Sequence, residues 1–143
     1  MRFDPALEAQ AAFAEAGRTG ELGEEWEQAV EAEEVFSACV GPEARAAYEA
    51  LQRIGARHPD AAAFQEFLIF ITWQQAAEET IALHFKTGIE LCDRYLARHA
   101  ERPGAGRARQ VREIRASFRA GLGLEAEDET AAEYDRDSFT GGD

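Results

Sequence analysis

Apolar side chains recur every three or four residues along most of the chain, which is the spacing that places them on one side of an α-helix. Five stretches carry this pattern, at residues 5–16, 24–40, 42–57, 61–100 and 106–120. Glycine or proline lies between most of them, as expected where one helix ends and the next begins. No stretch offers a partner strand for a sheet. The pattern therefore predicts an all-α protein, a bundle of about five helices.

The stretch 61–100 is much longer than the others, and Asp60 stands where it could cap the first turn. Forty helical residues would extend about 60 Å. A compact domain of this length is only about 37 Å across, because its expected radius of gyration is about 14–15 Å. We therefore expect one long central helix that either breaks at Gly88, its only glycine, or projects and pairs with another chain.

The run from Phe67 to Ile71 is apolar on every side of a helix, which indicates a buried position. Polar residues flank the run on both sides, so it falls short of the roughly 20 apolar residues that a membrane span needs. We expect this run to form the centre of the core or of a homodimer interface. The residues assigned to that interface are Phe67, Phe70, Ile71 and Trp73.

The formal net charge of −13 disfavours binding to nucleic-acid phosphates and to anionic membranes. Eight of the acidic residues lie in residues 125–143, where the only basic residue is Arg136. This composition predicts a disordered tail. We therefore expect a single helical domain over residues 1–122, followed by an acidic, flexible tail over residues 123–143.

One stretch near the C-terminal end is rich in arginine and forms the only candidate basic face. It is assigned to Arg107, Arg112, Arg115 and Arg119. One interpretation is that these residues neutralise the acidic stretch 21–34 or the acidic tail. The other is that they bind an acidic partner protein. No aromatic residues alternate with the arginines, which makes a nucleic-acid partner the weakest of the options.

Two acidic residues interrupt otherwise apolar helix faces, Glu33 in the second stretch and Glu78 in the long one. If those faces meet, the two carboxylates approach each other and could hold a divalent cation or perform acid–base chemistry. His84 is the third candidate ligand, although it lies about 120° around the helix from Glu78. The alternative is that each acid pairs with an arginine or reaches water.

The two cysteines, Cys39 and Cys92, are far apart in the sequence and each lies in an apolar pattern. We interpret them as buried, reduced thiols, with a disulfide between helices as the alternative. Residues 1–16 contain acids and no continuous apolar run, unlike a secretory signal peptide. Both features favour a cytoplasmic location.

The tripeptide His58-Pro59-Asp60 is similar to the signature of J-domain co-chaperones, in which it lies between two antiparallel helices. The similarity covers about twenty residues. The preceding stretch has only Arg45, Arg53 and Arg57 in place of a lysine-rich helix, and the following stretch is too long. These departures argue against assigning the chain to that family.

The common nucleotide-binding, metalloprotease and nucleophile motifs are all missing from the sequence. The preferred hypothesis is therefore a non-enzymatic interaction or adaptor protein, homodimeric through its apolar central helix, with no cofactor. The alternative is a helical-bundle metal-binding protein, or a carboxylate-dependent enzyme, that uses Glu33 and Glu78.

Overall fold

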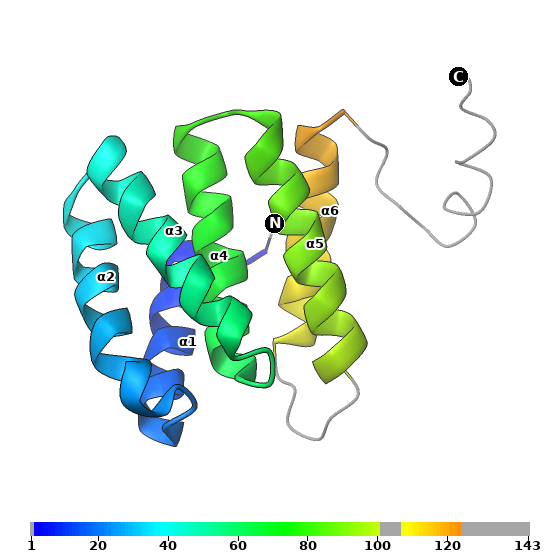
Figure 1. Cartoon of the computed structure of the whole chain (residues 1–143). Coiled ribbons are helices and arrows are strands. Elements are labelled where there is room, and N and C mark those ends of the chain that lie inside the picture. The colour runs from blue at the N-terminus through cyan, green and yellow to red at the C-terminus, as the bar shows by residue number, and fades with distance from the viewer. Residues whose placement is uncertain (1, 101–106, 124–143) are drawn as a thin grey trace.

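The computed structural model describes residues 2–100 and 107–123, and these contain six α-helices and no strand (Figure 1). The prediction of an all-α bundle is confirmed. The helices are α1 (Pro5–Thr19), α2 (Trp26–Ala38), α3 (Pro42–Arg57), α4 (Ala62–Glu78), α5 (Ala82–His99) and α6 (Ala108–Gly121), with a 3₁₀ turn η1 (Gly23–Glu25) before α2. The proposed boundary at residue 122 and the acidic tail beyond it lie at and past the end of the described residues.

Helix α4 is the centre of the bundle, because α1, α3, α5 and α6 all pack against it. Helix α2 packs instead on the outer side of α3. This position explains why residues 67–71 are apolar all round, since every side of α4 meets another helix. Among the described residues, no helix combines the length and the apolar character that crossing a membrane would require.

Several helix ends follow directly from the sequence. The Asp4 carboxylate accepts a hydrogen bond from the Ala6 N–H at 3.0 Å, and Pro5 begins α1. Gly20 ends α1 with φ of 70°, a left-handed conformation that glycine adopts without steric cost. Pro42 begins α3 in the same way that Pro5 begins α1.

Of the two alternatives for residues 61–100, the structure has the broken helix, but the predicted place of the break, Gly88, is wrong. The chain turns at residues 79–81, where Glu79 and Ile81 have extended backbones, and α5 returns antiparallel to α4. Gly88 lies inside α5 instead. A Cβ atom at Gly88 would lie 2.3 Å from Cζ of Phe118, so this glycine allows α6 to approach α5 closely.

The expected cap at Asp60 is also wrong. The first free N–H groups of α4, those of Ala63 and Phe64, donate to the two carboxylate oxygens of Glu21, at 3.2 and 3.1 Å. A carboxylate at this end of a helix also interacts favourably with the helix dipole. Asp60 accepts a hydrogen bond from Arg98 instead, at 2.6 Å.

The two cysteines are free thiols. Cys92 is buried, where desolvation raises the pKa of its thiol, and Cys39 is only half-buried at the end of α2. The prediction of reduced thiols agrees with this arrangement, although that of complete burial holds only for Cys92.

Candidate binding groove

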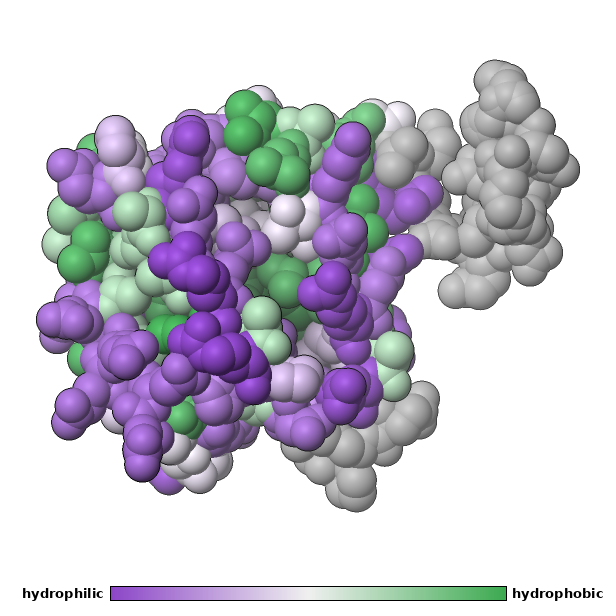
Figure 2. All heavy atoms as spheres, viewed as in Figure 1, coloured by the Kyte–Doolittle hydropathy of each residue, from purple (hydrophilic) through white to green (hydrophobic). Residues whose placement is uncertain are grey.

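A groove of about 940 Å³ lies between α3 and α5, and we call it the α3–α5 groove. Figure 2 shows apolar side chains at the bottom of this hollow, between bands of strongly hydrophilic residues on α3 and α5. Helix α4 supplies the floor through Gln65 and Leu68. The volume falls in the range of ordinary ligand sites, whereas the lining is more polar than is usual for a small-molecule site.

The groove exists because α3 and α5 each pack against α4 and leave a gap between themselves. Gly55 brings α3 close to the floor, since a Cβ atom there would lie 2.2 Å from Cδ1 of Leu68. The Gln65 amide nitrogen, which lies on α4, donates to the carbonyl oxygens of Gly55 at 2.9 Å and His58 at 3.0 Å. These bonds satisfy carbonyl groups at the end of α3 and hold that helix in place.

Contacts between the two walls fix both ends of the groove. At one end, Nε2 of His99 lies 3.1 Å from the carbonyl oxygen of Pro59, and Arg98 donates to Asp60. At the other end, the rings of Tyr48 and His84 meet edge to face with centroids 6.2 Å apart. The N-terminal half of α3 therefore lies beside the start of α5, and the residues that follow α3 lie beside the end of α5, which makes the two walls parallel.

Three arginines line the groove, Arg53 on α3 and Arg94 and Arg98 on α5, and all three are exposed. Arg98 forms an ion pair with Asp60. Within residues 2–100 and 107–123, no carboxylate lies within ion-pair distance of Arg53 or Arg94. These two guanidinium groups are therefore available to an anionic ligand.

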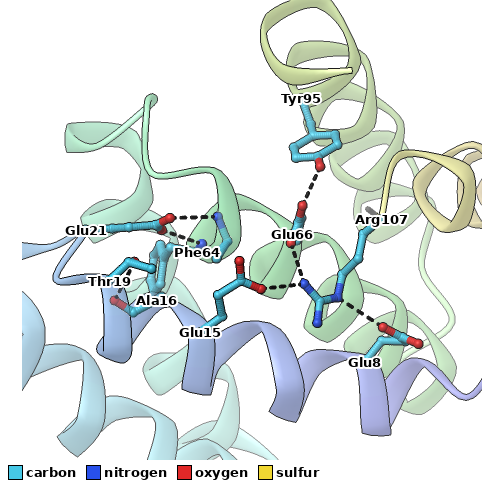
Figure 3. A network of polar contacts seen from close by, with 10 residues as sticks. Glu8, Glu15, Ala16, Thr19, Glu21, Phe64, Glu66, Tyr95 and Arg107 are labelled. Carbon is cyan, nitrogen blue, oxygen red and sulfur yellow. Dashed lines mark hydrogen bonds and ion pairs between the residues drawn. The ribbon is translucent and has the colours of Figure 1, made fainter. Parts of the chain in front are cut away.

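The Tyr95 side chain lies against the groove, and a buried polar cluster holds it from behind (Figure 3). Its hydroxyl donates to Glu66, which is only 2% exposed. Arg107 reaches the other oxygen of Glu66 at 3.1 Å and also contacts Glu15 at 2.9 Å and Glu8 at 3.1 Å. Burial raises the pKa of Glu66, while the hydrogen bond from Tyr95 and the charge of Arg107 act against the rise.

The Glu33 and Glu78 carboxylates, predicted to approach each other, line one smaller pocket of about 500 Å³. Side chains of α1, α2 and α4 line this pocket, and Gln74 of α4 is one of them. Ser37 donates to Glu33 at 2.7 Å. In the part of the chain that the structure describes, no group of three or more His, Cys, Asp and Glu residues is arranged to hold a metal ion.

His84 does not join that pocket. Its Nε2 lies 3.0 Å from Oε1 of Glu79, in the turn between α4 and α5. Arg45 donates to the other oxygen of Glu79 at 2.6 Å, and Gln75 contacts the first at 3.2 Å. Hydrogen bonds from Arg45 and His84 lower the pKa of Glu79 to about 2. His84 therefore has a structural role in closing this turn.

The proposed interface residues Phe67, Phe70 and Ile71 are at most 2% exposed within the single chain. Helices of the same molecule cover them, so a second chain could reach them only if the bundle opened. Trp73 is half-buried, with its ring against those of Phe85 and Phe118.

The proposed arginine face is divided by the structure. Arg107 points into the interior, where it meets Glu8, Glu15 and Glu66. Arg115 donates to Asp93 on α5 at 2.6 Å, whereas Arg112 is exposed. The described partners of Arg107 and Arg115 thus lie on α1, α4 and α5 and not in the expected stretch 21–34, while the acidic tail lies outside the described residues. The tripeptide His58-Pro59-Asp60 is likewise held internally, with His58 2.5 Å from Glu25.

The sequence pattern does not single out Arg53, Arg94 or Tyr95 as site residues. One signal was present, since Glu49 precedes Arg53 by four residues just as Glu90 precedes Arg94. Such pairs are common on exposed helix surfaces and do not single out a groove. Comparison with known proteins adds no assignment, because no family model, curated protein or solved structure shows significant similarity to the chain.

Proposed function

We propose that this chain is a non-enzymatic interaction module that binds a helical segment of a partner protein in the α3–α5 groove. The observation that carries the proposal is the pair of exposed arginines, Arg53 and Arg94, on walls that flank the apolar side chains of Leu68 and Leu91. A helix with an apolar stripe and charged flanks is the ligand that such a groove fits.

The form of the groove favours a helix over an extended peptide. The groove follows two parallel helices, and the described residues have no sheet edge to which a strand could be added. The two titratable side chains nearest its floor are engaged in structural contacts, Tyr95 with Glu66 and His99 with the Pro59 carbonyl. This engagement supports a binding role over a catalytic one.

The experiment uses two synthetic 14-residue helical peptides of identical composition, each with a leucine stripe and both charge signs on its flanks. Fluorescence anisotropy measures their affinity for the full chain. We expect at least one to bind, and the double variant R53E/R94E to bind it at least about tenfold more weakly. The matched control R109E/R112E makes the same charge change on α6, away from the groove, and keeps its affinity. Absence of binding by both peptides contradicts the proposal.

A second candidate is a divalent-cation site in the pocket that Glu33 and Glu78 share. Its support is that both carboxylates and the Gln74 amide line one hollow. Oxygen ligands of this kind suit hard cations, with water completing the coordination. The test is a thermal shift with Mg²⁺, Mn²⁺ or Zn²⁺ that Glu78→Ala removes and the nearby Glu34→Ala retains. No shift with any of these ions contradicts this candidate.

A further inference from the structure

The two walls of the α3–α5 groove carry their charges in the same order. On α3, Glu49 precedes Arg53, and on α5, Glu90 precedes Arg94. Because the two helices run parallel, both acids lie toward the end where the helices begin, and both arginines lie toward the end where they finish. Arg98 also lies at that second end, where its charge is paired with the Asp60 carboxylate. The groove is therefore negative at one end and positive at the other.

From this polarity we infer that the groove selects the direction of its ligand. It accepts an amphipathic helix that runs antiparallel to α3 and α5, with acidic residues in its N-terminal half and basic residues in its C-terminal half. This inference rests on the proposed function, and it specifies the partner segment by charge order and orientation.

Two further physical effects favour the same orientation. A helix is itself stabilised by acidic residues near its N-terminus and basic residues near its C-terminus, so the ligand has the charge order that its own dipole prefers. A helix antiparallel to both walls also opposes the dipoles of α3 and α5, which together outweigh the dipole of α4, to which this helix runs parallel. A parallel ligand that matched the groove charges would need its acids at the C-terminal end, which weakens the free helix.

The length of the groove fixes the length of the ligand. The residues of α5 that line it run from Thr87 to His99, which corresponds to about 18 Å at 1.5 Å per residue. About twelve ligand residues therefore face the groove, enough for apolar residues at three or four successive helix positions above Leu68 and Leu91.

The two peptides described above provide the test if they differ only in charge order. One has glutamates in the N-terminal half and arginines in the C-terminal half, and the other has these halves exchanged. We expect the first to bind about tenfold more tightly at low salt, because the second can match the groove charges only when it runs parallel to α3 and α5, with a charge order that weakens its own helix. In the variant E49R/R53E/E90R/R94E the charges of the first peptide match the groove only when this peptide runs parallel to α3 and α5, so we expect its orientation to reverse. All four side chains are exposed, so we expect this variant to fold, and its circular dichroism spectrum is the check.

Orientation is measured directly with a nitroxide label on either end of the preferred peptide. A label at the N-terminus is expected to broaden the amide signals of residues near Arg98, and one at the C-terminus those near Thr87. The opposite broadening pattern, or equal affinity of the two peptides, overturns the inference and leaves the proposed function standing. If neither peptide binds, the proposed function itself fails.

Discussion

Nη1 of Arg107 lies 3.1 Å from Oε1 of Glu66, a carboxylate that the bundle covers almost completely. Glu66 stands on α4, and Arg107 directly precedes α6, so this contact ties the last helix to the centre of the bundle. A buried carboxylate without a cation is costly, because the interior does not replace the water that the charge loses. The ion pair therefore controls the stability of the region behind the groove.

Arg107→Met removes the charge while keeping most of the side-chain volume. We expect the free energy of unfolding at pH 7 to fall by about 3 kcal/mol, because Glu66 is left buried without its partner. Urea titration measures this loss, and Arg109→Met, at an exposed site on α6, serves as the control. A comparable loss in both variants would show that the buried pair is unimportant.

The stability that Arg107→Met loses is expected to depend on pH. Burial already raises the pKa of Glu66 above its value in the unfolded chain, and losing Arg107 removes an effect that opposes this rise. A raised carboxyl pKa favours the folded state below the unfolded pKa, and this contribution is lost as pH rises through the folded pKa. The deficit of Arg107→Met is therefore expected to shrink between pH 7 and pH 5. If the loss in free energy of unfolding caused by Arg107→Met instead grows from pH 7 to pH 5, Glu66 does not have the raised pKa described here.

The contribution of Glu79 to stability has the opposite pH dependence. Its pKa is lowered to about 2, first by the hydrogen bond from Arg45 and then by that from His84. A lowered pKa stabilises the fold above the ordinary carboxyl pKa of about 4.5, and this stability is lost as pH falls toward 2. We expect wild type to exceed Glu79→Gln in stability at pH 6 and the difference to disappear near pH 2. Arg45→Ala should reduce the same difference, as thermal unfolding across the pH range would show.

Gly88 allows α5 and α6 to pack closely. Gly88→Ala places a methyl group where the Phe118 ring lies, and that ring is held between Trp73 and Phe85. Overpacking destabilises a fold by about 1–3 kcal/mol. Alanine has a better helix propensity than glycine, which offsets up to about 1 kcal/mol of this cost. We expect a net loss of about 1–2 kcal/mol, measured by urea unfolding. Phe118→Leu in the same chain should recover part of it. Stabilisation by Gly88→Ala would mean that the two helices do not meet there.

The sequence could not separate this role of Gly88 from a helix break. A glycine weakens any helix, but only the path of α6 shows that its missing side chain is needed. The real break, at residues 79–81, depends on Arg45, a residue 34 positions away that binds Glu79. Helix type and period were predictable because they are local. The break was not, because it depends on contacts between distant residues.

Glu21 and Asp60 allow a direct comparison of a distant cap with a local one. Glu21→Ala removes the acceptor of two N–H groups at the start of α4 and is expected to cost about 1 kcal/mol. Asp60→Ala removes only an exposed pair with Arg98 and is expected to cost less than about 0.5 kcal/mol. Urea unfolding of both variants checks the order. A larger loss in free energy of unfolding for Asp60→Ala than for Glu21→Ala would show that Asp60 caps α4, as the sequence predicted.

The sequence predicted part of the smaller pocket and little of the α3–α5 groove. Glu33 and Glu78 were recognisable because each interrupts an apolar face, and the structure places both in one pocket. Arg53 and Arg94 looked like ordinary solvated residues on amphipathic helices. Their importance comes from the spacing of α3 and α5 across α4, which no local pattern reports.

Phe70 distinguishes a core residue from a dimer contact. Its side chain is fully buried in the single chain, with the Phe3 ring 5.9 Å away. Phe70→Ala is expected to cost about 3–5 kcal/mol, because it leaves a cavity at the centre of the bundle. Leu7→Ala, at a side chain that is 62% exposed, should change stability by less than about 0.5 kcal/mol.

If Phe70 belongs to a monomer core, the wild-type unfolding midpoint does not depend on protein concentration. A midpoint that rises with concentration would instead show that association stabilises the fold. Loss of that dependence in a folded Phe70→Ala would assign Phe70 to the contact.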